Sequence, residues 1–540
     1  MATLSDSSSV YVDTAGTVIT DLTICFCSSP TPPATCEQCA LDGKNWHRVE
    51  KDLLLHSAKQ TAWLHVARTK ETDLTPADLV LTDIRIGEPD QEIGNLWESR
   101  PAGIWVRRGN YAGDVQQAVT QIDALFGKDA VDPRPQWNIM QESLQFDAKP
   151  EVPVARLSIL KGRSKARPNG PRPALRVNAD GKFKILQFSD THMVTGVGKC
   201  KDAIDGDGKA LPESEADPLT VIFLGKILDE EKPDLVILTG DQLHHDTPDS
   251  QSALFKVVAP LIERSVPWAA VFGNHDSEGK YALSREAQMA ILEDLPLSLC
   301  QSGPKNVDGI GNYYLQVLAP APSHIPLSTL FLLDSHGQIP SKIHSPDYDP
   351  INQSQIDWFT STSKTLKNEH DGESNHLSMA FLHIPIPEYG DPGLVTRGGK
   401  RREPTEGPSF NSHFYDALIE EGISALACGH DHVNDFCALH PRKQKDLALG
   451  TPQLGPWLCY GGGSGFGGYC SYGRKRFHRR TRVWEIDTST GNLKTYKRLE
   501  YSEQKMDELV LVEGGKVICP PAEADESTGL SSLLRECVVS

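Results

Sequence analysis

The segment Asp234–Thr239 (Asp-Leu-Val-Ile-Leu-Thr) constrains the fold of this chain more than any other. A strand with so few polar residues is typical of a sheet that is covered on both faces. Apolar runs of strand length also occur at 183–188 and 268–272, and segments with helical spacing of apolar residues separate the three runs, at 219–229 and 252–264. This alternation of strand and helix predicts an α/β domain with parallel strands.

Outside this core pattern, later strands are expected at 330–333, 377–382 and 424–427, and a strand at 483–486 is expected to close a second sheet. The N-terminal part instead holds short apolar or alternating runs bounded by turn residues, which indicate a β-rich domain. These runs are 10–12, 18–20, 63–66, 80–86 and 104–106. One helix is predicted there, at Val115–Phe126, because apolar residues recur in it at helical spacing.

The patterns divide the chain into four predicted parts. Residues 1–160 form a β-rich accessory domain, 161–178 a linker, 179–500 the α/β domain and 501–540 a C-terminal extension. The linker begins with the basic, proline- and glycine-rich stretch Lys161–Pro173. A solvated connector is the interpretation of this stretch, and contact of its charges with a partner is the alternative.

Composition limits the partners and the location of the protein. The chain has 540 residues and a formal net charge of −18, which disfavours non-specific binding of nucleic acid. Met1–Asp13 shows no signal-peptide pattern, and no apolar run is long enough to span a bilayer. We therefore expect a cytoplasmic protein without a membrane partner, for which nuclear entry stays open, and we interpret most of its 12 cysteines as thiols.

Four cysteines near the start form a competing metal motif, Cys25-x-Cys27 and Cys36-x-x-Cys39. Zinc-binding cysteine pairs are usually more widely spaced than Cys25 and Cys27. Free thiols are therefore the interpretation, and structural zinc is the alternative.

Five short segments with metal-binding side chains follow predicted strands. They are Ser189-Asp190-Thr191-His192, Gly240-Asp241, Gly273-Asn274-His275-Asp276, His383 in Phe381–Pro385, and Gly429-His430-Asp431-His432. Loops beyond the carboxyl ends of parallel strands converge on one crevice. Carboxylate, imidazole and amide groups are also the ligands that two divalent metals sharing a bridge require. The ordered set predicts a dinuclear metal site, although each segment alone would be an ordinary turn or strand end.

Spacing suggests how these side chains are used. Asp190 and His192 alternate, so an extended strand end can turn both toward one ion, whereas His430 and His432 can serve different ions. Asp241 follows a buried strand, which suits a bridging carboxylate, and Asn274 offers a neutral amide oxygen.

From about Phe183 to Asp487 the chain resembles the calcineurin-like metallophosphoesterase superfamily, and it is most similar to fungal phosphatases of the dosage-dependent cell-cycle-regulator type. The stretches that carry the resemblance are 234–241, 255–279, 308–317, 383–389, 429–437 and, in the N-terminal part, 97–108. The resemblance implies a four-layer α/β/β/α sandwich. It implies one metal held by Asp190, His192, Asp241 and His432, and a second held by Asp241, Asn274, His383 and His430. It gives His275 a catalytic role without binding metal, either as proton donor to the leaving group or as hydrogen-bond donor to the phosphoryl oxygen in the transition state.

The resemblance also implies the reaction. A hydroxide bridging two divalent metal ions would hydrolyse phosphate monoesters, including those of phosphoproteins. Manganese, iron and zinc all accept this ligand set. A phosphodiesterase acting on cyclic nucleotides or small diesters, and a non-catalytic scaffold on the same fold, are the alternatives.

Two departures narrow the subfamily. Purple acid phosphatases carry tyrosine three residues after the bridging aspartate, where this chain has His244. Calcineurin-type Ser/Thr phosphatases have Gly-Asp-x-x-Asp-Arg-Gly, where this chain has Gly240-Asp241-Gln242-Leu243-His244-His245-Asp246. The aspartate that orients the proton-donating histidine in those enzymes is therefore missing, and either Asp246 or Asp276 is a candidate to replace it.

Other signals stay open between a structural and a functional role. His244 and His245 are interpreted as surface loop residues, with a substrate-facing role as the alternative. His336, after an apolar strand, is a weaker candidate for the site. The glycine-dense segment Gly461–Gly468 is either a close backbone approach to the crevice or a flexible surface loop. The arginine- and lysine-rich segment 474–480 is interpreted as a solvated hairpin, with substrate steering or a localisation signal as alternatives.

Overall fold

The computed structural model describes residues 16–28, 43–55, 60–89, 96–146, 153–163, 172–340, 347–369, 376–440, 442–443, 454–519 and 538–539. The chain forms two compact units, one of residues 1–170 with 251–255 and the other of residues 171–250 with 256–540. No helix within the described ranges is long and apolar enough to cross a membrane.

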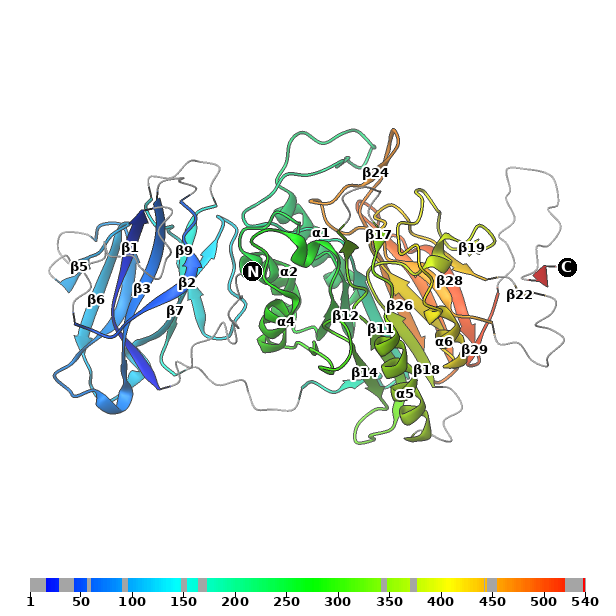
Figure 1. Ribbon diagram of the computed structural model, residues 1–540, viewed down its shortest axis with the longest axis horizontal. Helices are drawn as coiled ribbons and strands as arrows, with labels where there is room; N and C mark the ends of the chain where they lie inside the picture. Colours follow the sequence, from blue (N-terminus) through cyan, green and yellow to red (C-terminus); the bar gives the residue numbers. More distant parts are fainter. Residues whose placement is uncertain are drawn as a thin grey trace. The chain divides into compact units, whose positions relative to one another are not determined.

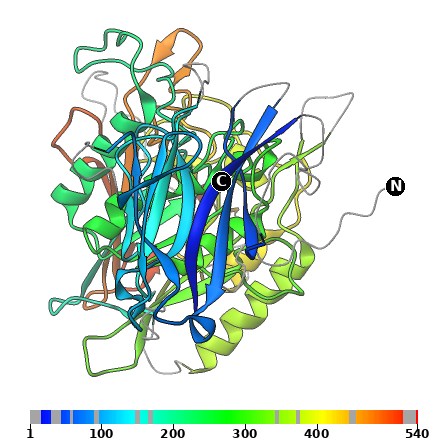
Figure 2. The same cartoon turned by 90° about the vertical axis from the view of Figure 1, so that its left-hand side faces the viewer.

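The first unit is built from antiparallel strands around an apolar core. Its described strands form three sheets: β1 (Thr17–Ser28), β3 (Gln60–Lys70) and β2 (Trp46–Asp52); β4 (Leu79–Ile86), β6 (Ile104–Asn110) and β5 (Glu98–Ser99); and β7 (Val119–Phe126), β9 (Ala155–Lys161) and β8 (Trp137–Ile139). Figure 2 shows these strands in blue to cyan. Leu64, Val106 and Leu157, one from each sheet, are fully buried in one core. The predicted β-rich character is confirmed, while the strand expected at 10–12 lies outside the described residues.

The helix predicted at Val115–Phe126 is wrong. Only Val115–Gln117 forms a short 3₁₀ turn, and β7 follows it and pairs with β9. The register of this pair shifts between Val119 and Gln121, as a β-bulge does. The bulge lets Val119 share the core with Ile122 and Phe126, so that a strand reproduces the three- and four-residue spacing of a helix.

The second unit contains two large sheets. The eight-stranded sheet has the order β10 (Leu175–Arg176), β14 (Tyr313–Leu318), β15 (Pro326–Leu332), β18 (Leu377–Phe381), β20 (Ala425–Cys428), β23 (Trp457–Tyr460), β21 (Cys437–Leu439) and β19 (Val395–Arg397). The seven-stranded sheet has the order β13 (Trp268–Val271), β12 (Leu235–Thr239), β11 (Lys182–Phe188), β26 (Arg480–Asp487), β27 (Asn492–Leu499), β28 (Met506–Glu513) and β29 (Lys516–Val517). Short pairs add β16 (Gln338–Ile339) with β17 (Asp347–Tyr348), β24 (Ser471–Tyr472) with β25 (Lys475–Arg476), and β22 (Arg442–Lys443) with β30 (Val538–Val539).

Alternating side chains place these sheets in four layers. Leu330 and Leu332 of β15 lie in a core shared with the seven-stranded sheet, whereas Phe331 faces the opposite way and packs with residues of the outer helices. The outer helices of the eight-stranded sheet are α5 (Gln353–Glu369) and α6 (Phe414–Glu420). Figure 1 shows α1 (Ala216–Glu231), α2 (Ser250–Glu263) and α4 (Arg285–Asp294) on the other side, next to β12. The α/β/β/α sandwich is confirmed.

Two expectations about the end of this domain are wrong. β26 was expected to close the second sheet. It instead pairs antiparallel with β11, on the edge of β11 that β12 does not occupy, and so extends the seven-stranded sheet. β28 and β29 continue the same sheet, so the sandwich runs past residue 500 into the segment expected to be a C-terminal extension.

The interpretation of the cysteines as mostly thiols is also wrong. Cys437 and Cys459, on the neighbouring strands β21 and β23, form a disulfide, and Cys25, Cys27 and Cys519 are disulfide-bonded as well. Among the described cysteines only Cys200, Cys300, Cys428 and Cys470 are free. Bonded sulfur is not available as a thiolate, which excludes both free thiols and zinc ligation at Cys25 and Cys27. Disulfides are typical of oxidising compartments, so the cysteines do not support the cytoplasmic expectation.

Candidate metal centre

The predicted ligand segments lie at the carboxyl ends of five strands from both sheets. Asp190 and His192 follow β11, Asp241 follows β12, and Asn274 and His275 follow β13. In the other sheet, His383 follows β18, and His430 and His432 follow β20. Backbone hydrogen bonds join neighbouring loops, for example Asp190 N to Gly240 O at 3.0 Å and Gly429 N to His383 O at 3.1 Å. Parallel pairing therefore aligns the loops within each sheet. Packing of the two sheets then brings segments 240 residues apart together, since His430 N donates to Asp190 Oδ1 at 3.2 Å.

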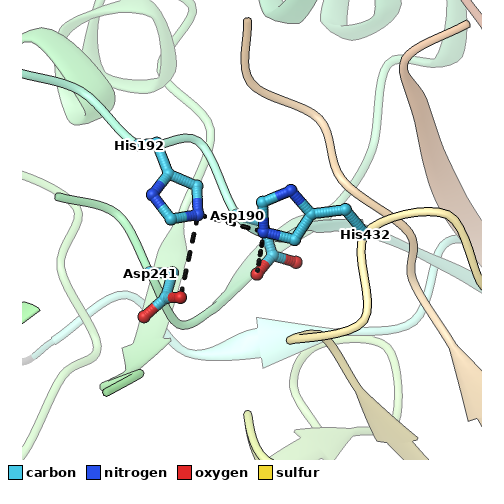
Figure 3. Close-up of side chains that lie close together, drawn as sticks. All are labelled: Asp190, His192, Asp241 and His432. Carbon is cyan, nitrogen blue, oxygen red and sulfur yellow. Dashed lines mark hydrogen bonds and ion pairs between the residues drawn. The ribbon is translucent and has the colours of Figure 1, made fainter. Parts of the chain in front are cut away.

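One cluster contains Asp190, His192, Asp241 and His432, all nearly inaccessible to solvent. Figure 3 shows the four side chains pointing into one space. One ligand atom of each lies within 4.8 Å of the others. The Nε2 atoms of His192 and His432 are 3.1 Å apart, and Asp241 Oδ2 lies 3.7 Å from His192 Nε2.

A second cluster shares Asp241 and adds His383 and His430. The Nε2 atom of His383 lies 3.3 Å from Asp241 Oδ2. Asn274 is buried next to this group, since the backbone N–H of His275 donates to Asp241 Oδ1 at 2.9 Å. The structure thus brings together the residues of both predicted ligand sets around one shared carboxylate, while their role as ligands stays a prediction.

The hydrogen bonds of these side chains suit divalent cations. Nδ1 of His383 lies 2.8 Å from Thr239 O and Nδ1 of His432 lies 2.7 Å from Tyr469 O, so each ring donates to a carbonyl and keeps the Nε2 lone pair for a metal. Asn274 Oδ1 and His430 Nε2 are buried without a hydrogen-bond partner. Buried polar atoms are normally satisfied, so these orphan atoms fit a site built for ions.

The electrostatics of the cluster agree with this chemistry. Burial lowers the pKa of His192 and His430 far below the usual value and that of His432 to about 3, which keeps these rings in the neutral form that binds metals. Burial also raises the pKa of Asp190 to about 7, with the carboxylate of Asp241 adding to the effect. Burial lowers the pKa of His383, but the carboxylate of Asp241 outweighs burial and raises it to about 9, so a cation bound there would displace a proton from this ring. Two crowded carboxylates form a site that a bound cation would stabilise.

Left-handed backbone turns, rather than an extended strand end, orient the first pair of candidate ligands. Asp190 and His192 have φ values of 55° and 46°, and Asp241 and His430 share this left-handed conformation at 49° and 75°. The expectation of an extended alternation was therefore wrong. Left-handed non-glycine residues cost on the order of 1–3 kcal/mol each and persist where the surroundings enforce them, often at functional sites.

Comparisons with known proteins agree with this geometry. A sequence profile described as calcineurin-like phosphoesterase matches residues 183–434. Phosphatase DCR2 of Saccharomyces cerevisiae is 35% identical over 408 residues, which cover 72% of this chain and 65% of the yeast protein, slightly under two thirds of its length. Probable inactive purple acid phosphatase 29 of Arabidopsis thaliana is 36% identical over 358 residues, which cover 61% of this chain and 85% of the plant protein. The chain belongs to the calcineurin-like phosphoesterase family.

Two further similarities are weaker. A protein named probable cyclic nucleotide phosphodiesterase from Rhodococcus erythropolis is 24% identical over 258 residues, covering 47% of this chain and 66% of the bacterial protein. Among solved structures, a dimetal phosphatase from Danio rerio aligns with a TM-score of 0.40 and 13% identity, over 61% of this chain and 99% of that one.

The glycine-dense loop Gly461–Gly468 of this calcineurin-like phosphoesterase covers the first cluster. It is buried, and its amides bind the ligand loops: Ser464 N donates to Ser189 O at 2.9 Å and Gly465 N to Asp190 O at 3.1 Å. A Cβ atom at Gly468 would collide with the rings of His192 and His432. The close backbone approach is thus confirmed, and the flexible surface loop is wrong.

His275 lies at the edge of the site with its ring partly exposed. Its Nε2 is 4.0 Å from Asp241 Oδ2, and its Nδ1 is 2.5 Å from Glu278 Oε1. Burial lowers the pKa of His275, but the carboxylates of Asp241 and Glu278 outweigh burial and raise it to about 9. Neither sequence candidate for its orienting carboxylate contacts the ring. Asp246 binds His244 Nδ1 at 2.7 Å, and Asp276 accepts the amides of Gly273 and Leu243.

The remaining candidates fall into different surroundings. His244 is half-buried, with its ring centroid 5.7 Å from that of His192, and His245 is exposed with its centroid 5.5 Å from that of His275. Both therefore border the phosphoesterase site rather than a remote surface. His336 instead hydrogen-bonds Gln355 Oε1 through Nε2 at 2.7 Å and does not belong to either ligand cluster.

The basic segment 474–480 splits into two parts. Arg474–Arg476 is exposed around the β24–β25 turn, whereas Arg479 and Arg480 are buried. Arg479 Nη2 donates to Gly468 O at 3.1 Å and so supports the glycine loop. A solvated hairpin is the right interpretation for the first part only.

A buried ion network holds the loop that carries His430 and His432. Asp435 lies 2.5 Å from Arg480, 2.6 Å from Arg402 and 3.0 Å from Lys497. Burial would raise the pKa of Asp435, but Arg480, Lys497 and Arg402 outweigh it and hold the pKa far below the usual value. Neither this network nor the contact of Glu278 with His275 is predicted from the sequence. The contact of His275 with Glu278 could be predicted from their three-residue spacing if the short helix α3 (His275–Glu278) were recognised in the sequence.

Proposed function

We propose that this chain is a dinuclear metal-dependent phosphatase that hydrolyses phosphate monoesters, including those of phosphoproteins. The observation that carries the proposal is that the Asp241 carboxylate belongs to two separate sets of ligand atoms. Two bound divalent cations, of manganese, iron or zinc, would neutralise charge on the phosphoryl group and favour ionisation of an attacking water.

The chain's own residues take distinct roles in this proposal. Asp190, His192, Asp241 and His432 would hold one cation, and Asp241, Asn274, His383 and His430 the other. His275, which reaches solvent and faces Asp241, would donate a proton to the leaving oxygen. The presence of all seven candidate ligands together with His275 favours an active enzyme over a non-catalytic scaffold, and the net charge of −18 favours a substrate other than nucleic acid.

Metal analysis together with a pair of substrates tests the proposal. The purified protein is expected to hold about two transition-metal ions per chain and to hydrolyse p-nitrophenyl phosphate faster than bis(p-nitrophenyl) phosphate. Faster turnover of the diester would favour the phosphodiesterase alternative. A chain that turns over phosphate esters without metal would contradict the proposal.

Replacing His275 tests the proton donor. We expect His275→Ala to lower kcat on phenyl phosphate by roughly 10²–10⁴-fold, because the phenolate would leave without a proton from the ring. Its metal content should stay that of the wild type. His324→Ala, which removes an exposed histidine between β14 and β15, is the matched control and should retain full activity. An unchanged kcat in His275→Ala would remove this residue from the mechanism.

A further inference from the structure

We propose that Glu278 is a positioning residue that orients His275 for proton donation, in place of the aspartate that is absent from the segment after Asp241. This inference rests on the proposed function. It extends that function by naming the carboxylate that holds the donor ring in its productive orientation and tautomer.

One contact holds the ring of His275 and another holds its backbone. Glu278 Oε1 accepts from Nδ1 at 2.5 Å, across the three-residue spacing of the short helix α3, and the His275 backbone N–H donates to Asp241 Oδ1 at 2.9 Å. With Nδ1 bound to a carboxylate, the proton available for transfer is on Nε2. That atom faces the metal centre, 4.0 Å from Asp241 Oδ2. The ring centroid is 5.3 Å from that of His192.

Other carboxylates near the ring have different partners. Asp246 binds His244, on the same loop as His245. Asp276 is fully buried and accepts backbone amides on both of its oxygens, including Gly273 N at 2.7 Å. Glu278 is therefore the described carboxylate that is placed to bind Nδ1 of His275.

The proposed step balances. As the bond between phosphorus and the leaving oxygen breaks, that oxygen takes the proton from His275 Nε2 and departs as an alcohol. The attacking water supplies the new oxygen on phosphorus, and one of its protons returns to Nε2. Glu278 keeps its hydrogen bond to Nδ1 throughout and so holds the ring in one orientation, as carboxylates that orient catalytic histidines do.

Leaving-group dependence separates this role from a structural one. Glu278→Gln is expected to lower kcat on phenyl phosphate by roughly 10–100-fold, the usual cost of losing an orienting partner. On p-nitrophenyl phosphate the loss should be small, because p-nitrophenolate departs without protonation. Glu278→Asp should recover part of the activity on phenyl phosphate. Glu286→Gln, at an exposed glutamate on α4, is the matched control and should behave as the wild type. Equal losses on both substrates, or no loss on phenyl phosphate, would overturn the inference.

A spectroscopic measurement keeps the inference separate from the activity. In the ¹H NMR spectrum of protein with ¹⁵N-labelled histidine, the Nδ1–H proton of His275 should appear at unusually low field. It should disappear in both Glu278→Gln and His275→Ala. Its absence from the wild type would refute the contact whether or not the enzyme is active. A wild-type signal in a protein that hydrolyses no phosphate ester would instead reject the proposed function, and with it the proton transfer, while leaving the contact in place.

Discussion

Asp241→Ala is expected to abolish binding of both metals and to lower phosphatase activity by about 10³-fold or more. Its carboxylate is common to both ligand clusters, so one substitution removes a charged ligand from each cation. Cations that stabilise phosphoryl transfer contribute several kcal/mol to lowering the barrier, and each 1.4 kcal/mol corresponds to about tenfold in rate. Metal content by mass spectrometry of the purified variant and kcat/KM on phenyl phosphate measure the two effects.

Two further variants test whether the loss of metal and activity comes from the shared carboxylate. Asp241→Asn keeps the shape and one ligand oxygen, so it should retain more metal than Asp241→Ala and still be severely impaired. Asp229→Asn removes an exposed aspartate that binds Arg264 on the surface of the helical layer, and it should match the wild type in both measurements. An Asp241→Ala protein that keeps two metal ions would show that the shared carboxylate is not a ligand.

Asp435→Asn is expected to lower the free energy of unfolding by about 3–5 kcal/mol, the usual cost of removing one partner from a buried ion network. The substitution would leave Arg480, Lys497 and Arg402 beside a neutral amide, with the first two almost fully buried. Urea unfolding followed by tryptophan fluorescence measures the loss. Glu213→Gln, which breaks the exposed pair with Lys199, should leave the midpoint nearly unchanged.

The same network predicts a pH dependence. Because the pKa of Asp435 is depressed in the folded chain, its stabilisation is complete at neutral pH and is lost as the pH falls below the unfolded value of about 4. The stability gap between wild type and Asp435→Asn should therefore narrow in that acidic range. A gap that stays constant below pH 4 would mean that the ionised carboxylate is not what stabilises the loop.

Most of what can be predicted about this site comes from local sequence patterns. The run 235–238 lacks polar residues because both faces of β12 are covered, and parallel strands of this kind deliver their following loops to one edge of their sheet. Asp190, Asp241 and Asn274, which follow strands of one sheet, could therefore be expected to meet from their order and type alone. Their meeting with His383 and His430 of the facing sheet is implied by the resemblance. The sequence also predicts the four-layer sandwich through the resemblance that these segments carry.

Features that depend on pairing between distant residues could not be predicted in the same way. A bulge opposite β9 makes the apolar spacing of β7 resemble a helix, and the left-handed turns at Asp190 and His192 follow from the loops packed around them. The disulfide between Cys437 and Cys459 can be predicted only if β21 and β23 are known to be neighbours. Asp435 likewise acquires its partners from strands that lie 45 and 62 residues further along the chain.

The two sheets each supply only part of either ligand set. Asp190, His192 and Asp241 need His432 from the facing sheet, and Asn274 needs His383 and His430. A newly synthesised chain therefore has no complete chelating pocket until the two halves of the sandwich have closed on each other. On the proposed ligand assignment, the chain would take up its cations only after the two sheets have packed together, and bound metal would mark a folded chain.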